Sequence, residues 1–252
     1  MMTKQNLIDY TLHLADNALI IGHRNSEWCG HGPILEQDIA ISNIALDYIG
    51  QARNFYQYAA QLQGNASTED SLAYLRDVVD FKNCLLVELP NGDWGQTVLR
   101  QFFFCTYQYF FYRQLQNSSD KQLAAIAEKA LKEVTYHVRW SSEWVIRLGD
   151  GTQESKQRVL HAVDELWSYT GEMFQPACYE LLALSEGYGI DLTSIKNSWD
   201  AKIKSVFEEA TIPLPTVAWM QSGGKEGRHS EHLGFVLEEM QFLQRANPGA
   251  EW

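Results

Sequence analysis

The sequence predicts an all-α protein that folds as one antiparallel helical bundle. Its six prolines leave residues 34–89 and 91–175 free of proline, and proline is excluded from helix interiors because it lacks an amide proton and clashes with the preceding turn. Apolar residues recur every three or four positions, for example from Leu123 to Leu148, which is the helical period. Alternating patterns of strand-forming residues are hard to find. Long helices joined by short turns are typical of an antiparallel bundle.

Glycine, proline and capping residues separate the predicted helices. Breaks are expected at residues 29–33, 90–93 and 149–152, because these runs carry turn-forming residues. Asp191 or Thr193 is suited to cap the helix that follows it. The predicted helices span residues 4–24, 34–63, 70–88, 94–117, 120–148, 153–186, 192–209 and 229–246. Residues 211–228 are predicted to be extended, and without a linker or repeat the chain is expected to be one domain over 1–252.

Composition narrows the class of protein. The 20 basic and 32 acidic residues give a formal charge of −12, which disfavours nucleic acid and anionic membranes as partners because both repel negative charge. A hydrophobic fraction of 45% excludes a disordered chain. The four cysteines form no C-x-x-C pair, and no apolar run reaches the roughly 18 residues of a membrane span. We therefore expect a cytoplasmic protein.

A bundle of long helices is a natural cradle for two iron ions. Such a site needs a Glu from each of two helices and a Glu-x-x-His pair from each of two others. The only such pair, Glu226 to His229, follows Gly223-Gly224 and is interpreted as a solvated loop before the last helix. Residues 94–119 contain no Asp or Glu, so that helix cannot supply a bridging carboxylate. We therefore predict no metal ligated by this chain.

Remnants of a metal site are still expected inside the bundle. His137 faces the apolar stripe of its helix, but the position three residues before it is Val134, and Glu133 points partly sideways. Tyr48 and Gln51 are the inward polar residues of the helix over 34–63. Buried polar groups need partners, so we predict that Tyr48, Gln51, Glu133 and His137 hydrogen-bond to one another in place of a metal.

Other catalytic patterns are absent. The sequence has no phosphate-binding or dinucleotide-binding glycine motif and no nucleophile elbow, and Gly223-Gly224-Lys225 is interpreted as an ordinary turn. Asp38, Asp47 and Arg53 are expected to form a buried ion network rather than a catalytic pair. The basic residues considered as phosphate contacts, each more often simply solvated, are Lys82, Lys225 and Arg228.

Several long motifs resemble the C subunit of the bacterial phenylacetyl-CoA epoxidases. They are Glu27-Trp28-Cys29-Gly30-His31-Gly32-Pro33, the run from Ile44 to Phe55, the run from Val87 to Gly92, and the C-terminal stretch from Gly223 to Arg245. The resemblance implies a ferritin-like four-helix bundle with additional helices and a degenerate metal site. It also implies a non-catalytic, structural role in a heterodimer with the catalytic subunit, which carries the di-iron centre. That assembly adds one oxygen atom across the ring 1,2-bond of phenylacetyl-CoA, with electrons from a flavin and iron–sulfur reductase.

The resemblance further implies that this chain contributes to the pocket for the CoA thioester. The first candidate segment is Asp80-Phe81-Lys82-Asn83, where Lys82 and the Asn83 amide suit phosphate or pantetheine and Phe81 would pack on adenine. The second candidate segment is Leu181-Leu182-Ala183, which would offer mainly backbone groups. We expect the aromatic helix over 94–117, or its neighbours, to contact the di-iron partner.

Two other functions stay open at this point. The first is a di-metal oxidase with unconventional ligands drawn from Asp38, Asp47, Glu133, His137 and His161. The second is a helical binding module unrelated to oxygen chemistry that forms a homodimer. Self-association of the isolated chain through an unoccupied interface is compatible with the preferred interpretation as well.

Overall fold

The computed structural model describes residues 4–216 and 219–250, and the regular structure in that part of the chain is helical. The α-helices are α1 (Lys4–Ser26), α2 (Leu35–Gln63), α3 (Glu69–Tyr74), α4 (Leu85–Glu88), α5 (Trp94–Leu115), α6 (Lys121–Gly149), α7 (Gln153–Leu166), α8 (Cys178–Ser185), α9 (Leu192–Glu209) and α10 (Glu231–Ala246). Short 3₁₀ turns lie at Val78–Asp80, Trp167–Tyr169, Gly171–Phe174 and Gly224–Glu226. The all-α prediction is confirmed. No helix within the described ranges is both long and apolar enough to cross a membrane.

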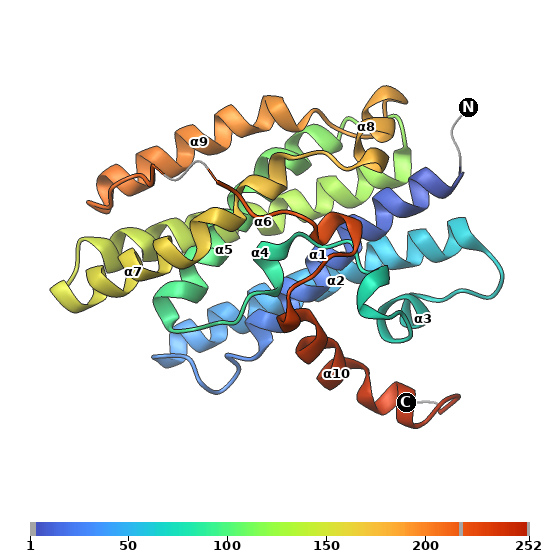
Figure 1. Cartoon of the computed structure of the whole chain (residues 1–252), viewed down its shortest axis with the longest axis horizontal. Helices are drawn as coiled ribbons and strands as arrows, with labels where there is room; N and C mark the ends of the chain where they lie inside the picture. The colour runs from blue at the N-terminus through green and yellow to red at the C-terminus, as the bar shows by residue number, and fades with distance from the viewer. Residues whose placement is uncertain (1–3, 217–218, 251–252) are drawn as a thin grey trace.

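Four long helices form the bundle (Figure 1). Helix α1 packs against α2, α5 packs against α6, and α2 meets α6. Helices α7 and α9 cover α5 and α6, whereas α8 lies against α1. Helix α10 extends from the opposite side of the bundle to α9 and packs against α3 and α1 (Figure 1). The chain ends near the tip of α10 in this view.

Helix α5 runs through the aromatic core. Phe102, Phe103, Phe104 and Phe111 are buried, and Trp199 of α9 packs on Phe103 while donating its indole N–H to the Phe103 carbonyl at 2.9 Å. A helix that is apolar on all sides is buried within its own protein. This chain therefore covers most aromatic side chains of α5, although Tyr109 and Phe110 stay half-buried. The expectation that this helix or its neighbours contact the di-iron partner stays a prediction.

The predicted helix over 70–88 is interrupted. Helix α3 ends at Tyr74, a 3₁₀ turn follows, and residues 81–84 are non-helical until α4 begins at Leu85. The Arg76 guanidinium, just after α3, pairs with the fully buried Asp16 of α1. That long-range ion pair draws the chain across α1, so tertiary contacts override the local helical pattern here.

The predicted helix over 153–186 is also interrupted, at Leu166. Pro176 lies inside that range, and a proline cannot continue a helix. Glu172 precedes it in a 3₁₀ turn and is buried with its carboxylate bound to backbone amides. The other predicted helices are confirmed to within about two residues at each end, the usual scatter of helix boundaries. Residues 217–218 of the predicted extended segment lie outside the described residues; the rest is extended apart from the 3₁₀ turn at Gly224–Glu226.

Candidate functional site

The bundle interior holds two hydrogen-bond chains built mainly from neutral side chains. In the first, the Gln101 amide of α5 donates to the Tyr48 hydroxyl of α2 at 2.9 Å. The Asn25 amide of α1 donates to the Gln101 carbonyl oxygen at 2.8 Å. All three side chains are fully buried. Burial raises the pKa of the Tyr48 hydroxyl well above its usual value, so Tyr48 is a neutral phenol and a poor metal ligand.

The second chain crosses from α2 to α6 and α5. Gln51 donates to the Glu133 carboxylate at 2.9 Å and accepts from the Tyr112 hydroxyl at 3.2 Å. Gln108 donates to the same Tyr112 hydroxyl at 3.3 Å. Burial raises the pKa of the Glu133 carboxyl, although the hydrogen bond from Gln51 partly offsets this. Glu133 is therefore held by an amide rather than by a cation.

His137 is bound by Asp47, which the preferred prediction placed in an ion network and the oxidase alternative grouped with His137. Its Nε2–H donates to the Asp47 carboxylate at 3.0 Å, and its ring packs on Tyr48 with centroids 4.9 Å apart. The predicted mutual network is thus correct for Gln51 with Glu133. It is wrong for Tyr48 and His137, whose hydrogen-bond partners are Gln101 and Asp47. Asp47 lies one residue before Tyr48 on α2 and is part-exposed, whereas the sequence predicted it in a buried ion network.

This interior does not suit a carboxylate-bridged metal pair. Val134 is buried and has no donor atom, and the neighbouring amides and phenols are already used in hydrogen bonds. In the described ranges, no group of three or more His, Cys, Asp or Glu residues is gathered as a metal site. A bridging carboxylate on α5 is also missing from the described helix.

The residues proposed for an ion network or an unconventional metal site are dispersed. Asp38 lies at the start of α2 and accepts from the Gly32 amide at 3.0 Å. Arg53 is exposed and lies 3.6 Å from Glu69. His161 is exposed on α7. The prediction of a buried network among Asp38, Asp47 and Arg53 is therefore wrong. Among the five residues considered for an oxidase, Asp47 and His137 are the pair in direct contact.

The first candidate segment is held from behind by α1. The Lys82 backbone amide donates to Asp16 at 2.8 Å, and the Lys82 carbonyl accepts from His13 Nδ1 at 2.7 Å. The Lys82 ammonium lies 3.8 Å from the Asp9 carboxylate of α1 and 5.5 Å from the ring centre of Tyr179 on α8, and a quarter of its side chain is exposed. Asp80 is exposed at the end of its 3₁₀ turn. Asp80 therefore presents its charge to solvent, whereas Lys82 is part-exposed and paired with Asp9.

The two neighbours of Lys82 are turned inward. Phe81 is fully buried beneath the Arg76 guanidinium, which lies 4.2 Å from its ring centre. Asn83 is fully buried and donates to the Glu88 carboxylate at 2.8 Å. The predicted packing of Phe81 on adenine and of the Asn83 amide on phosphate is therefore not supported by these side-chain positions.

The second candidate segment lies on the outer face of α8. Leu181 and Leu182 are exposed, whereas Ala183 is buried. Tyr179, two residues before Leu181, contacts both Lys82 and the ring of His13. The fold therefore brings the two candidate segments to the same side of α1, which their separation in sequence did not reveal.

Buried charges surround this region, and local sequence patterns missed most of them. The Lys225 ammonium pairs with Glu180 at 2.9 Å, and each side chain is 3% exposed. Glu88 pairs with His229 at 2.8 Å, and both side chains are buried. The interpretations of Lys225 as solvated and of His229 as part of a solvated loop are therefore wrong. Their partners lie far away in sequence, so spacing alone gives no signal for either pair.

Known proteins share both the sequence and the fold of this chain. Residues 1–252 match the sequence profile of a family described as phenylacetic acid catabolic protein. The C subunit of the 1,2-phenylacetyl-CoA epoxidase from Escherichia coli (strain K12) is 45% identical over 246 residues, covering 98% of this chain and 99% of that protein. A protein with aldehyde deformylating oxidase activity from Synechococcus has a similar structure, with a TM-score of 0.52 and 15% identity over 91% of this chain and 92% of its own. The latter likeness concerns the fold alone and agrees with the ferritin-like prediction.

Proposed function

The chain belongs to the phenylacetic acid catabolic protein family, and on this premise we propose that it is the structural subunit of a phenylacetyl-CoA epoxidase. The observation that carries the proposal is 45% identity to the C subunit of such an enzyme over nearly the whole of both chains. In this role the chain binds the di-iron catalytic subunit, contributes to the CoA-thioester pocket, and carries no metal of its own.

The bundle interior supports the non-catalytic part of this proposal. Most of its inward polar side chains, among them Tyr48, Gln51 and Gln101, are neutral and hydrogen-bond to other side chains of the bundle. Ferrous ions need anionic oxygen donors and imidazoles. A bundle whose centre is closed by amides and phenols keeps its shape without metal, and that is what a scaffold requires.

Lys82 is the residue proposed to reach the CoA portion. Its ammonium is part-exposed beside Asp9, while its peptide group is clamped by Asp16 and His13. A lysine on a fixed backbone suits a phosphate or pyrophosphate group, to which it binds as a point charge. Exposed Leu181 and Leu182 on the adjoining α8 supply apolar contact for the pantetheine arm. In this proposal the other residues of the two segments position Lys82, Leu181 and Leu182. They are Asp80, Phe81, Asn83 and Ala183.

An apolar stripe on α2 is the proposed face for the catalytic subunit. Leu35, Ile39 and Leu46 are between 52% and 72% exposed, and their spacing places them on one side of the helix. Gly50 continues the stripe, and a Cβ added there would meet nothing within 4 Å. Tyr136 is also exposed, on helix α6, which packs against α2 and α5. Large exposed side chains in helical register are typical of an interface between subunits.

Co-expression with the catalytic subunit tests the proposal. We expect the two chains to co-purify, and phenylacetyl-CoA turnover with the reductase to fall at least tenfold when this chain is omitted, while the catalytic subunit keeps its iron. Leu46→Asp should abolish co-purification, whereas Leu214→Asp, an equally drastic change at another exposed leucine, should not.

Lys82→Ala tests the proposed CoA contact in the same complex. The substitution should raise KM for the thioester about tenfold without changing complex formation, as expected when one charge-assisted contact is lost. Lys202→Ala on α9 is its control. Failure of the two chains to associate, or stoichiometric iron in this chain, would contradict the proposal.

The homodimeric binding module is tested by the same materials. Sedimentation of the isolated chain reports its self-association. If a stable homodimer forms and excludes the catalytic subunit, the function is that of a homodimeric binding module and the proposed structural-subunit function is wrong. If the catalytic subunit dissociates the homodimer, the exposed α2 stripe simply pairs with itself when its proper partner is absent.

A further inference from the structure

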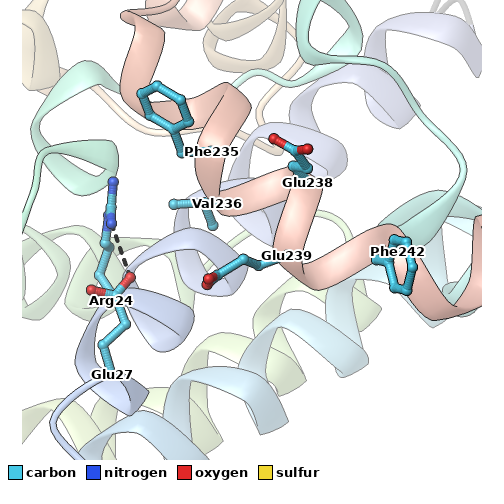
Figure 2. Close-up of a pocket in the computed structure, with 7 residues that line it drawn as sticks. All are labelled: Arg24, Glu27, Phe235, Val236, Glu238, Glu239 and Phe242. Carbon is cyan, nitrogen blue, oxygen red and sulfur yellow. Dashed lines mark hydrogen bonds and ion pairs between the residues drawn. The ribbon is translucent and has the colours of Figure 1, made fainter.

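A groove between α10 and the end of α1 is not used by the proposed function. Arg24 and Glu27 line it on α1, and α10 contributes Phe235, Val236, Glu238, Glu239 and Phe242 (Figure 2). The groove encloses about 710 Å³. Its lining includes no residue of the α2 stripe and does not include Lys82. We propose that this groove binds a positively charged amphipathic helix of another protein in the epoxidase assembly.

The apolar part of the groove is built for helix packing. Phe235 and Phe242 are 60% and 64% exposed, and seven residues separate them, which is two helical turns or about 10.5 Å. The buried Leu233 and Leu237 on the opposite face fix α10 against the body of the protein. Two outward aromatic rings on one helical face match apolar residues spaced i and i+7 on a second helix.

The charge of the groove selects the partner. Arg24 is already bound, because it donates to the Glu88 carbonyl, the His232 carbonyl and Glu27. Glu238 and Glu239 are exposed and form no ion pair with any residue that the structure describes. In Figure 2 Glu239 extends from α10 toward Arg24 and Glu27, so carboxylates lie on both sides of the groove. Lysine or arginine on the incoming helix would neutralise them.

The same charges disfavour the other occupants. A second copy of this chain would bring Glu238 and Glu239 against their own equivalents or against a chain of net charge −12, and like charges repel. A nucleic acid, an anionic membrane or the phosphates of CoA would meet the same repulsion.

The groove is also rigid before any partner arrives. The Ser230 amide at the start of α10 donates to Glu88 at 2.7 Å, and His229 binds the same carboxylate. At the other end, Arg245 donates to the Arg76 carbonyl and to Asp77. A docking surface held at both ends loses little conformational entropy on binding.

The proposal rests on the proposed function for the existence of other subunits, and its test separates the two. The full-length chain is mixed with the purified catalytic subunit or, separately, with the purified reductase, and affinities are measured at 50 and 300 mM salt. We expect Glu238→Lys/Glu239→Lys to weaken the binding of one of these proteins by at least tenfold at low salt, and Phe235→Ser/Phe242→Ser by a similar factor at both salt concentrations. The charge control is Glu208→Lys/Glu209→Lys on the exposed face of α9, which should leave affinity within about twofold because distant exposed charges contribute little.

The outcomes are distinguishable. Loss of binding in the groove variants with co-purification through α2 retained supports the groove. Three outcomes would overturn the groove proposal. The first is unchanged affinity for both proteins in all groove variants, and the second is an effect on self-association alone. The third is an equal loss of affinity in the α9 control variant. If Leu46→Asp fails to disturb the catalytic subunit while the groove variants do, the groove is correct and the α2 assignment is wrong. Circular dichroism of each variant verifies folding, which exposed substitutions should not affect.

Discussion

The bundle interior and segment 81–85, which is non-helical up to the first residue of α4, are both largely buried, yet they satisfy most of their polar groups in different ways. In the bundle, backbone groups bond within helices, so neutral side chains such as Tyr48 and Gln101 complete the network. Segment 81–85 has no such ladder, and most of its bound peptide groups have ionisable side chains as partners. His229 binds the Phe81 carbonyl, Asp16 and His13 bind the peptide groups of Lys82, and Glu172 binds the Leu85 amide. The neutral exception is Asn17, which accepts from the Cys84 amide at 2.9 Å.

The difference shows where this protein keeps its buried charge. Every buried backbone group needs a partner, and a carboxylate can accept several amide protons with charge-assisted strength. Glu172 accepts from the amides of Leu85 and Gly223, each at 2.7 Å. The bundle centre, where related architectures hold metals, has mostly neutral groups instead. Charge in this chain therefore supports irregular backbone, and the following substitutions test that division.

Asp16→Ala should have the largest effect. It removes the acceptor of the buried Arg76 guanidinium, of the Tyr56 hydroxyl at 2.5 Å and of the Lys82 amide at 2.8 Å. Leaving a buried guanidinium without its carboxylate should lower the free energy of unfolding by about 3–5 kcal/mol, measured by urea denaturation. A loss below about 1 kcal/mol, the value of one neutral hydrogen bond, would remove the contrast between the two regions.

Lys225→Met should come next. It leaves buried Glu180 with the Ala177 amide at 2.8 Å and His13 Nε2 at 3.5 Å as its remaining close polar neighbours, and the expected loss is about 3 kcal/mol. The double variant Lys225→Met/Glu180→Gln should lose less than the two single variants together, because removing both charges leaves none unpaired. Strict additivity of the three measurements would mean that the pair is not coupled.

His229 should make stability depend on pH. Burial lowers the pKa of its imidazole, but the hydrogen bond and charge of Glu88 outweigh burial and raise that pKa above its usual value of 6.5. Both ring nitrogens face acceptors, at 2.8 Å and 2.9 Å, so the folded state favours the imidazolium. The stabilisation is fully present below about pH 6.5 and is lost as pH rises through the folded pKa. The stability advantage of the wild type over His229→Gln should therefore shrink from pH 6 to pH 9. An advantage that grows with pH would contradict the assignment.

Tyr48→Phe in the bundle should have the smallest effect. It leaves the Gln101 amide without its acceptor at 2.9 Å, and the expected loss is about 1 kcal/mol. Because no ion is involved, this loss should not change between pH 6 and pH 8, while the effect of His229→Gln should. A loss of unfolding free energy as large as that of Asp16→Ala would show that polar contacts in the bundle centre contribute as much to stability as those of segment 81–85.

The sequence predicts the bundle well because its helices are long and self-contained. Residues 34–63 and 120–148 have uninterrupted apolar periodicity, and α2 and α6 follow them closely. The interruption after Tyr74 was missed because it depends on the buried Asp16, whose partners are distant in sequence. The predicted helix over 153–186 contained Pro176, a local signal against one continuous helix, whereas the distant amides that bind Glu172 gave no such signal.

The candidate site was predictable only in part. The resemblance placed Lys82 and Leu181 in separate segments, and the structure brings these segments to one side of α1. The resemblance did not indicate that Phe81 and Asn83 point inward, because an alternation of buried and exposed residues cannot be recognised in a short irregular segment. His137 was correctly expected inside the bundle, but its partner Asp47 was grouped with it only in the oxidase alternative and not in the predicted hydrogen-bond network.

Glu88 and Glu172 also bear on the order in which the chain is made. The Ser230 amide, which binds Glu88, is 142 residues further along the chain, and the Gly223 amide, which binds Glu172, is 51 residues further along. The last quarter of the protein therefore supplies hydrogen-bond donors to carboxylates of earlier segments. During synthesis the bundle helices leave the ribosome before these amides exist, and protein chains emerge at about 5–20 residues per second. For several seconds the nascent chain therefore has its acidic groups open to water, and closure of the fold waits for the C-terminus.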